Sequence, residues 1–273
     1  MKILIAADME GVTGVTTWEQ VTPGHAEYMR FRKLMTQDVN AAIRGVIEAG
    51  ADEVLVTDGH WNGSNLLIEE LDPRAKLNTG SPSPLSMMQG MDESVDGVCF
   101  IGYHARNGTP NAVLDHTWSS KTVANVWLNG LLTGEYGLNA AVAGHFGAPV
   151  IMVSGDQTAC AQIAELLGDV EMAVVKRATG RFSAECFPPQ VTQELIFMSA
   201  ARAVERLLEG DAPDLFILDT PIQVTVEFFT SDMAERAARM PFTQREGLKV
   251  SFVAEEMIAA YNGFRALVGL ASG

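Results

Sequence analysis

The sequence predicts an α/β protein with a mostly parallel sheet flanked by helices, followed by a smaller α+β portion at the C-terminus. Up to about residue 185, short apolar runs alternate with helical patterns, as expected of parallel strands joined by helices. After Pro188-Pro189, apolar residues alternate with polar ones, which is typical of half-exposed antiparallel strands. The 273 residues, 47% hydrophobic and 19% charged, are enough for a sizeable core. We expect an α/β domain over residues 1–188 and the smaller α+β portion over residues 189–273.

The first predicted unit is a strand, a helix and a second strand. Lys2–Ala7 is apolar and predicts a buried strand, and residues 27–49 predict an amphipathic helix. Apolar side chains recur at helical spacing at Phe31, Met35, Val39, Ala42, Ile43 and Val46. Gly50 lies where a glycine commonly ends a helix. The strand at 54–57 follows directly, which indicates a right-handed βαβ unit.

The remaining elements follow from the same patterns. In the first portion we expect a short helical piece at 64–71, strands at 97–103, 149–153 and 173–175, and helices from Glu135 and over 158–167. In the second portion we expect helices at 190–209, near 231–239 and at 254–270, and strands at 222–229 and 249–253. The segment 105–134 is rich in Asn, Gly, Thr, Ser and Trp and predicts a long loop, which in a compact domain is usually functional.

Composition and charge narrow the class of partner and the compartment. The formal net charge of −15 argues against nucleic acid, because phosphates require a basic face. Cys99, Cys160 and Cys186 are widely spaced and odd in number, which argues against a disulfide framework and favours a reducing compartment. The N-terminal apolar run is too short for a signal peptide, and no run approaches the length of a membrane span. We expect a cytoplasmic protein with neither nucleic acid nor a membrane as its partner.

Acidic residues and histidines follow three of the predicted strands where each strand ends. These strand ends are Asp8-Met9-Glu10-Gly11, Asp58-Gly59-His60 and Tyr103-His104. The carboxyl ends of parallel strands open onto one crevice, so these carboxylates and imidazoles are expected to meet there. Together they would form a site for divalent metal. The alternative is that each histidine is structural or solvated, and no compact motif such as H-E-x-x-H excludes it.

Glu135, at the start of a predicted helix, adds a third carboxylate to Asp8 and Glu10. Several carboxylates in one cleft repel one another unless cations neutralise them. With the two histidines they supply enough ligands for two metal ions, one carboxylate bridging both. Such a pair binds a shared hydroxide at neutral pH and polarises a carbonyl. These ligand types suit zinc best, with manganese or cobalt as alternatives. Asp58 either orients one histidine ring or is a turn residue before Gly59.

Three further polar residues are candidates for contacts with a substrate. Lys176 follows the fifth predicted strand, where it would meet a substrate carboxylate or form a solvated strand end. Asn129 would donate a hydrogen bond to a developing oxyanion, or form a turn before Gly130. Asp156 would bind a free amine of the substrate, or cap the helix that begins near Thr158.

Several motifs taken together resemble the zinc-dependent D-aminopeptidase family of the DppA type. They are Asp8-Met9-Glu10-Gly11, Asp58-Gly59-His60, Gly102-Tyr103-His104-Ala105, Asp115-His116-Thr117, Asn129-Gly130, Gly134-Glu135-Tyr136-Gly137-Leu138-Asn139 and Val153-Ser154-Gly155-Asp156. The resemblance covers most of the first 185 residues and extends more loosely to the end. As a set the motifs are specific, whereas any one alone would be weak.

The resemblance implies both a metal centre and an assembly. The ligands that it implies for two zinc ions are Asp8, Glu10, His60, His104 and Glu135, with Asp8 bridging. It implies a catalytic role for His116 and a homo-oligomer, a ring-stacked decamer whose active sites face an inner chamber. The family signature has serine two residues before the aspartate, and this chain has Ala6, which would remove one hydrogen bond near the ligands.

The function that these features predict is that of a metallo-aminopeptidase acting on short peptides with an N-terminal D-residue, such as D-Ala-D-Ala. Zinc-bound hydroxide would attack the peptide carbonyl, and His116 would transfer a proton or stabilise the tetrahedral intermediate. One alternative is another metal-dependent hydrolase of amides or esters, although no P-loop or basic phosphate clamp favours a phosphoester. The other is a non-catalytic α/β binding module, which would hold no stoichiometric metal.

Overall fold

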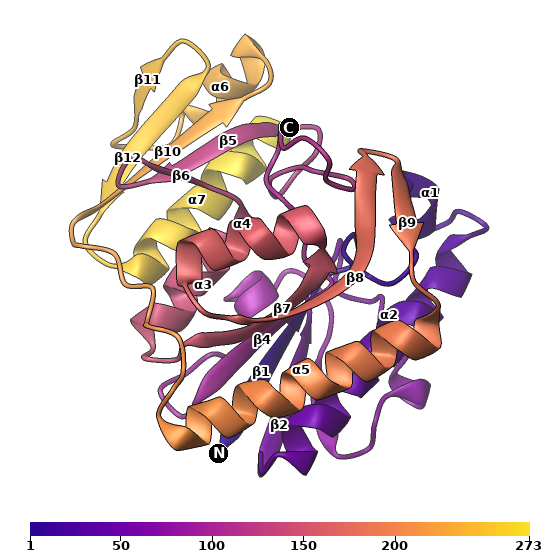
Figure 1. The fold of residues 1–273 in the computed structure, drawn as a ribbon. Coiled ribbons are helices and arrows are strands. Elements are labelled where there is room, and N and C mark those ends of the chain that lie inside the picture. Colours follow the sequence, from indigo (N-terminus) through magenta and orange to yellow (C-terminus); the bar gives the residue numbers. More distant parts are fainter.

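The computed structural model describes all residues from 1 to 273 and contains two β-sheets (Figure 1). The larger sheet has seven strands in the order β3-β2-β1-β4-β7-β8-β9, and the smaller has five in the order β11-β12-β10-β5-β6. The strands of the larger sheet are β1 (Lys2–Ala7), β2 (Glu53–Asp58), β3 (Ala75–Asn78), β4 (Gly97–Ile101), β7 (Val150–Asp156), β8 (Glu171–Gly180) and β9 (Ser183–Cys186). All their pairings are parallel except that of β8 with β9, which confirms the predicted fold class.

The register of the central strands brings their ends together. Ala7, the last residue of β1, pairs with Asp58 at the end of β2 and with Ile101 at the end of β4. Residues that directly follow these strands therefore emerge at one edge of the sheet, as is general for open parallel sheets. The N-terminus lies at the opposite edge, far from the smaller sheet (Figure 1).

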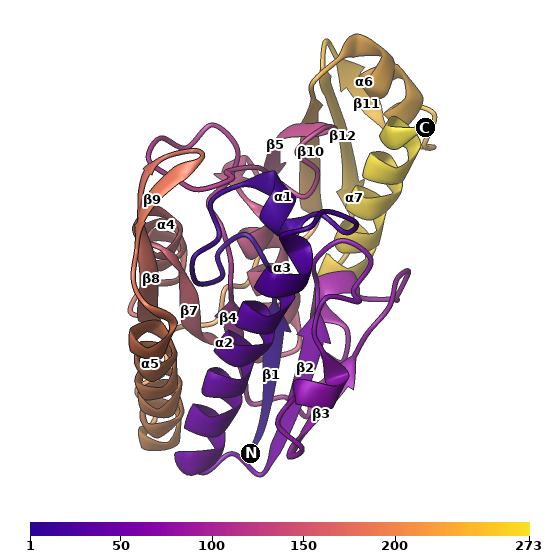
Figure 2. The same cartoon turned by 90° about the vertical axis from the view of Figure 1, so that its right-hand side faces the viewer.

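Helices cover both faces of the larger sheet, because its central strands are apolar on both sides. Ile3, Ile5 and Ala7 of β1 pack in the core beneath α2 (Tyr28–Glu48) and α5 (Pro189–Glu209), which lie side by side (Figure 2). The alternate residues, Leu4 and Ala6, join the core on the other face. That face is covered by α3 (Glu135–His145) and α4 (Gln157–Leu167).

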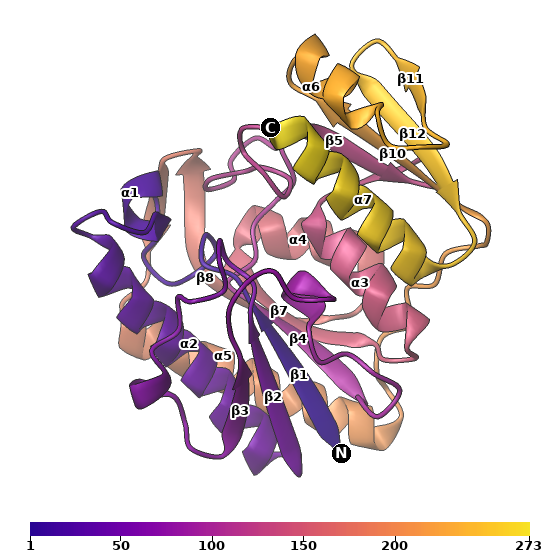
Figure 3. The ribbon, with the colours of Figure 1, turned by 180° about the vertical axis from the view of Figure 1, so that it is seen from behind.

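The smaller sheet draws on two distant parts of the chain. Its strands are β5 (Val123–Leu128), β6 (Leu131–Thr133), β10 (Ile222–Phe228), β11 (Gln244–Glu246) and β12 (Lys249–Ala254). The alternation predicted for residues 222–229 is present, since every second side chain of β10 is buried. Helix α6 (Ser231–Ala237) accompanies this sheet, and α7 (Met257–Ser272) packs between it and α3 (Figure 3).

The packing divides the chain differently from the expected boundary at residues 188 and 189. Helix α5 lies beyond that boundary in sequence but packs on α2 and β8, so it belongs to the larger sheet. Conversely, β5 and β6 come from the segment 105–134, expected to be a loop, and β5 pairs with β10. Long-range strand pairing decides both placements, and short strands such as β6 leave little periodic signal.

The short elements complete the fold. They are α1 (Trp18–Val21) and the single 3₁₀ turns η1 (Ile68–Glu70) and η2 (Ser86–Met88). The helical piece expected at 64–71 is thus reduced to η1, whereas the strand expected at 173–175 extends over all of β8. None of the helices combines the length and apolar character needed to cross a bilayer.

Gly45 determines how closely α2 and α5 approach. A Cβ atom at Gly45 would lie 2.4 Å from the carbonyl oxygen of Phe197 in α5. We expect Gly45→Ala to destabilise the protein by about 1–3 kcal/mol, because the helices must move apart. The matched control is Gly269→Ala in α7, where a Cβ meets no atom within 4 Å. Helix propensity should make that change neutral or stabilising by up to about 1 kcal/mol. Urea unfolding of both variants checks this, and equal effects would contradict it.

Candidate metal centre

Six buried carboxylate and imidazole side chains meet at the carboxyl edge of the larger sheet, each at most 7% exposed. They are Asp8 and Glu10 after β1, His60 after β2, His104 after β4, His116 before β5, and Glu135 at the start of α3. The structure therefore brings together all five residues predicted as metal ligands and the one predicted as catalytic. Strand ends alone supply four of them.

The turn after β1 is held tightly against the end of β4. The backbone N–H of Asp8 donates to the Ile101 carbonyl at 2.8 Å, and that of Gly11 donates to the Gly102 carbonyl at 2.7 Å. A Cβ at Gly11 would lie 2.0 Å from the carbonyl oxygen of Tyr103, so only glycine fits there. Gly102 has a φ of +76° and its own Cβ would lie 2.3 Å from the Asp8 carbonyl oxygen. The two glycines thus permit Asp8, Glu10 and His104 to converge.

The two carboxylate oxygens of Asp8 face two different histidines. Its Oδ1 is 3.2 Å from Nδ1 of His60, and its Oδ2 is 3.4 Å from Nε2 of His104. Glu10 Oε2 lies 3.1 Å from the same His60 nitrogen, and Glu135 Oε1 lies 2.6 Å from the same His104 nitrogen. Asp8 therefore stands between an acid–histidine pair on each side, which is the arrangement a bridging carboxylate needs.

Backbone carbonyls fix which nitrogen of each histidine faces the cluster. His60 Nε2 lies 2.7 Å from the Val21 carbonyl oxygen, and the Nδ1 atoms of His104 and His116 lie 2.9 Å and 2.8 Å from those of Ala105 and Leu114. Because a carbonyl can only accept, each of these nitrogens carries the proton. The opposite nitrogen of each ring faces the carboxylates, where it would offer a lone pair to a metal ion on losing its proton.

The buried charges in this cluster shift the pKa values of one another. Burial, and then the adjacent Glu10 charge, raise the pKa of the Asp8 carboxyl to about 7. Burial lowers the pKa of His104, but Glu135 and the other carboxylates outweigh it and raise that pKa to about 10. Asp8 Oδ2 and Glu10 Oε2 are buried and accept no hydrogen bond. Unpartnered buried acceptors of this kind are costly unless an ion fills the space between them.

The residues present fit a bound cation in more than one grouping. One set of ligand atoms within 4.8 Å of one another comes from Asp8, Glu10 and His104, and another from His104, His116 and Glu135. Imidazole nitrogen with carboxylate oxygen is a donor set typical of zinc. The cluster can therefore hold metal, and the orphaned oxygens are the observation that supports this.

The cluster opens into a cleft of about 1030 Å³. Its walls include the indole rings of Trp18, Trp61 and Trp118, and the Trp118 backbone N–H donates to Glu135 Oε2 at 2.7 Å. Helix α7, which packs on the smaller sheet, contributes Asn262 and Arg265 to the cleft. Sequence analysis did not identify these wall residues, because α7 has only the pattern of an ordinary amphipathic helix.

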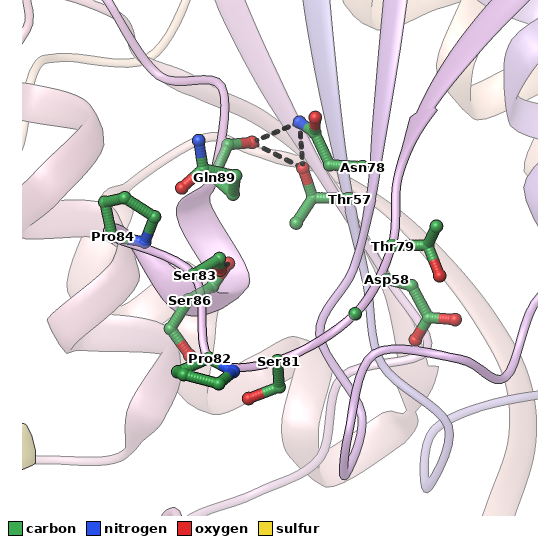
Figure 4. Close-up of a pocket in the computed structure, with 11 residues that line it drawn as sticks. Thr57, Asp58, Asn78, Thr79, Ser81, Pro82, Ser83, Pro84, Ser86 and Gln89 are labelled. Atoms are coloured by element: carbon green, nitrogen blue, oxygen red, sulfur yellow. Dashed lines mark hydrogen bonds between the residues drawn. The ribbon is translucent and has the colours of Figure 1, made fainter.

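A second, polar pocket of about 440 Å³ adjoins the cleft through Ser81 and Ser86 (Figure 4). Asp58 lies at this pocket, but its carboxylate accepts from the backbone N–H groups of Asn65 and Leu66 at 2.5 Å and 2.8 Å. It therefore holds the loop after His60 instead of orienting the imidazole ring. Of its two predicted roles, the local structural one is correct.

The three predicted substrate contacts lie elsewhere. Asn129 is exposed in the β5–β6 turn, where its side chain bonds the backbone of Asp219 and Gln223 at 2.7 Å each. Asp156 caps α4 through the N–H groups of Thr158 and Ala159, and its other oxygen accepts from Val113. Lys176 is wholly buried, its ammonium donates only to backbone carbonyls, and burial lowers its pKa to about 8. None of the three residues lines the cleft in this structure.

Fold and site together define a class of protein: an α/β enzyme-like fold with a buried carboxylate–histidine centre at the carboxyl edge of its sheet. The model of the family Peptidase M55, described as D-aminopeptidase, matches residues 1–266. The chain is 36% identical over 273 residues to the D-aminopeptidase of Bacillus subtilis (strain 168), covering 99% of this chain and 98% of that protein.

A solved structure agrees with the sequence comparison. The Zn-dependent D-aminopeptidase DppA from Bacillus subtilis, described as a self-compartmentalizing protease, matches with a TM-score of 0.96 at 35% identity. The match covers 100% of this chain and 98% of that one. The chain belongs to the Peptidase M55 family of D-aminopeptidases, which confirms the predicted resemblance and places it among the peptidases.

The role of Asp156 as a helix cap can be tested by removing its carboxylate. Asp156→Ala leaves three backbone N–H groups without their acceptor, and we expect it to cost about 2–4 kcal/mol of unfolding free energy. Asn129→Ala, in the exposed turn, should cost about 1 kcal/mol or less. Urea unfolding measures both. Lost peptidase activity in a variant of Asp156 with unchanged stability would instead show that this carboxylate binds substrate.

Proposed function

We propose that this protein is a two-zinc aminopeptidase that hydrolyses short peptides with an N-terminal D-residue, such as D-Ala-D-Ala. The observation that carries the proposal is the placement of Asp8, whose oxygens face an acid–histidine pair on each side. Family membership supports the reaction class, and the relative described as Zn-dependent supports the metal. In this proposal Glu10 and His60 would hold one ion, His104 and Glu135 would hold the other, and Asp8 would be the ligand shared by both.

When bound, the zinc pair would lower the pKa of a water molecule to near neutrality and polarise the scissile carbonyl. The chain's own contribution is to bring its ligands together before zinc binds. Five ligand side chains are held within a buried cluster, and three imidazoles are oriented by backbone carbonyls. Little reorganisation is then needed, which is how a preorganised site stabilises charge that develops during a reaction.

His116 is placed to move a proton beside this centre. Its ring stacks on His104, with ring centroids 4.0 Å apart and planes at 11°, and its Nε2 lies 3.9 Å from Glu10 Oε1. Burial, and then the charge of His104, lower the pKa of His116. A neutral imidazole with Nδ1–H bonded to Leu114 presents Nε2 as the proton acceptor. We infer that Nε2 takes the proton of the attacking water and passes it to the leaving amine.

The cleft suits a small substrate. Its volume of about 1030 Å³ is at the upper end of the range for small-ligand sites. Indole walls and a charged floor match a short peptide with a free amine, and we propose that the shape of the cleft selects the D-configuration. We also propose a cytoplasmic homo-oligomer, a decamer by resemblance, in line with the relative described as self-compartmentalizing.

Ala6 departs from the family signature, which has serine at this position, and it leaves the proposed ligands in place. The residue is the next-to-last of β1, is wholly buried, and belongs to the apolar cluster beneath α3 and α4. We propose that its methyl group removes a hydrogen bond near the ligands without removing a ligand.

Chelation provides the first test. Protein treated with a chelator should lose hydrolysis of D-Ala-D-Ala and recover it with about two zinc ions per chain, measured by elemental analysis. The control panel contains the L-dipeptide, D-aminoacyl amides and a phosphoester. Full activity in the chelator would contradict the proposal. Preference for another amide or ester would favour a different hydrolase, and absence of bound metal would favour a binding module.

His116→Gln separates a catalytic role from a ligand role. We expect kcat to fall by about 100-fold or more, with KM and zinc content unchanged, because only proton transfer is removed. Steady-state kinetics and elemental analysis measure the two quantities together. Loss of one zinc ion per chain would show instead that His116 is a ligand with His104 and Glu135, a grouping that the distances also allow.

A further inference from the structure

Lys176 is a buried charged side chain with no role in the proposed reaction. It lies in β8 with no exposed surface, and its ammonium donates to the carbonyl oxygens of Glu10, Val12 and Val15 at 2.6, 2.9 and 2.8 Å. An ammonium has three protons, so its donor capacity is used in full. All three acceptors belong to the turn that follows β1. The segment 10–15 is therefore folded around the cation.

Burial of the Lys176 ammonium costs free energy, and the three carbonyl groups that offset this cost all belong to the short segment 10–15. Burying an ammonium is unfavourable in general, and carbonyl dipoles offset this cost only when they converge on the charge. No carboxylate forms an ion pair with Lys176, so its charge is balanced by these carbonyls and by more distant acids. Removing the ammonium would leave three buried carbonyls with no donor.

The Glu10 side chain depends on its backbone for its position. Both Glu10 carboxylate oxygens face histidines of the cluster, with Oε2 3.1 Å from His60 Nδ1 and Oε1 3.9 Å from His116 Nε2, and Oε2 accepts no hydrogen bond. The Glu10 main chain is instead fixed on both sides of its peptide group. Lys176 binds its carbonyl at 2.6 Å, and the next N–H, that of Gly11, binds the Gly102 carbonyl at 2.7 Å.

A second anchor acts farther along the same turn. The Asp38 carboxylate accepts from the backbone N–H and the hydroxyl of Thr13 at 2.9 and 3.0 Å, and that hydroxyl oxygen lies 2.8 Å from the Thr192 hydroxyl. These bonds join the turn to α2 and α5, away from the cluster. Lys176 is the anchor that acts on Glu10 itself.

We propose that Lys176 is a positioning residue that holds the Glu10 carboxylate ready to bind metal. The inference rests on the proposed function in taking Glu10 as a ligand. Lys176 acts through the main chain and touches neither metal nor substrate. Its removal should therefore weaken the ion bound by Glu10 and His60 and leave the ion bound by His104 and Glu135 largely unaffected.

The first test compares zinc affinity in Lys176→Met, Lys176→Arg and a control, measured by competition with a chromophoric chelator. Outer residues that hold metal ligands typically change affinity by about 10–100-fold. We expect a loss of that size at one of two ions in Lys176→Met, with partial recovery in Lys176→Arg, which keeps charge and donors. The control is Val226→Ala, a core truncation in β10 that lowers stability at a distance. Two unchanged affinities, or the same loss in the control, would overturn the proposal.

The second test needs no metal. Crystal structures of chelator-treated wild type and Lys176→Met should differ in the main chain of residues 10–15 and in the Glu10 carboxylate, with Asp8 and His60 in place. An undisplaced Glu10 would overturn the proposal. Wild-type protein that binds no zinc would refute the two-ion function separately, while this comparison still decides whether Lys176 positions Glu10.

Discussion

Three buried carboxylates, those of Asp8, Glu10 and Glu135, lie within reach of the same histidines, and the rest of the site depends on how their charge is balanced. Carboxylates this close, removed from water, repel one another strongly. Protonated histidines can balance part of the charge, but two carboxylate oxygens still lack a donor. A bound cation would supply the missing partner for both oxygens.

Backbone contacts hold the charged side chains of the site close together despite their mutual repulsion. Gly11 and Gly102 let the ends of β1 and β4 approach more closely than side chains would permit. The backbone carbonyls of Val21, Ala105 and Leu114 orient the three imidazoles. Lys176 donates a hydrogen bond to the backbone carbonyl of Glu10 in the turn after β1. Two extensive apolar cores on the faces of the larger sheet contribute most of the free energy of folding. Their burial of apolar surface offsets the cost of burying the charged side chains of the site.

The sequence predicted the centre better than it predicted the surroundings. Asp8, Glu10, His60 and His104 each follow an apolar run directly, so placing the strands was enough to place the ligands. Asn129 follows β5, Asp156 ends β7 and Lys176 lies within β8, yet the side chains of all three bind backbone groups. A predicted strand end locates the backbone of a residue at the edge of the sheet. The hydrogen-bond partner of its side chain belongs to a segment that is distant in sequence, so the strand pattern does not identify that partner. The expected boundary at residue 188 differs from the packing for the same reason, since α5 packs on a helix more than 140 residues earlier.

By itself the sequence determined the parallel α/β order, the edge of the sheet where the acids and histidines gather, and the family, because periodicity and strand ends are local properties. Tertiary structure alone decided that β5 joins β10, that Asp8 stands between two acid–histidine pairs, and that Lys176 turns inward. These depend on which distant backbone groups lie nearby once both sheets have formed. Such contacts leave no periodic trace along the chain, and only the packed molecule specifies them.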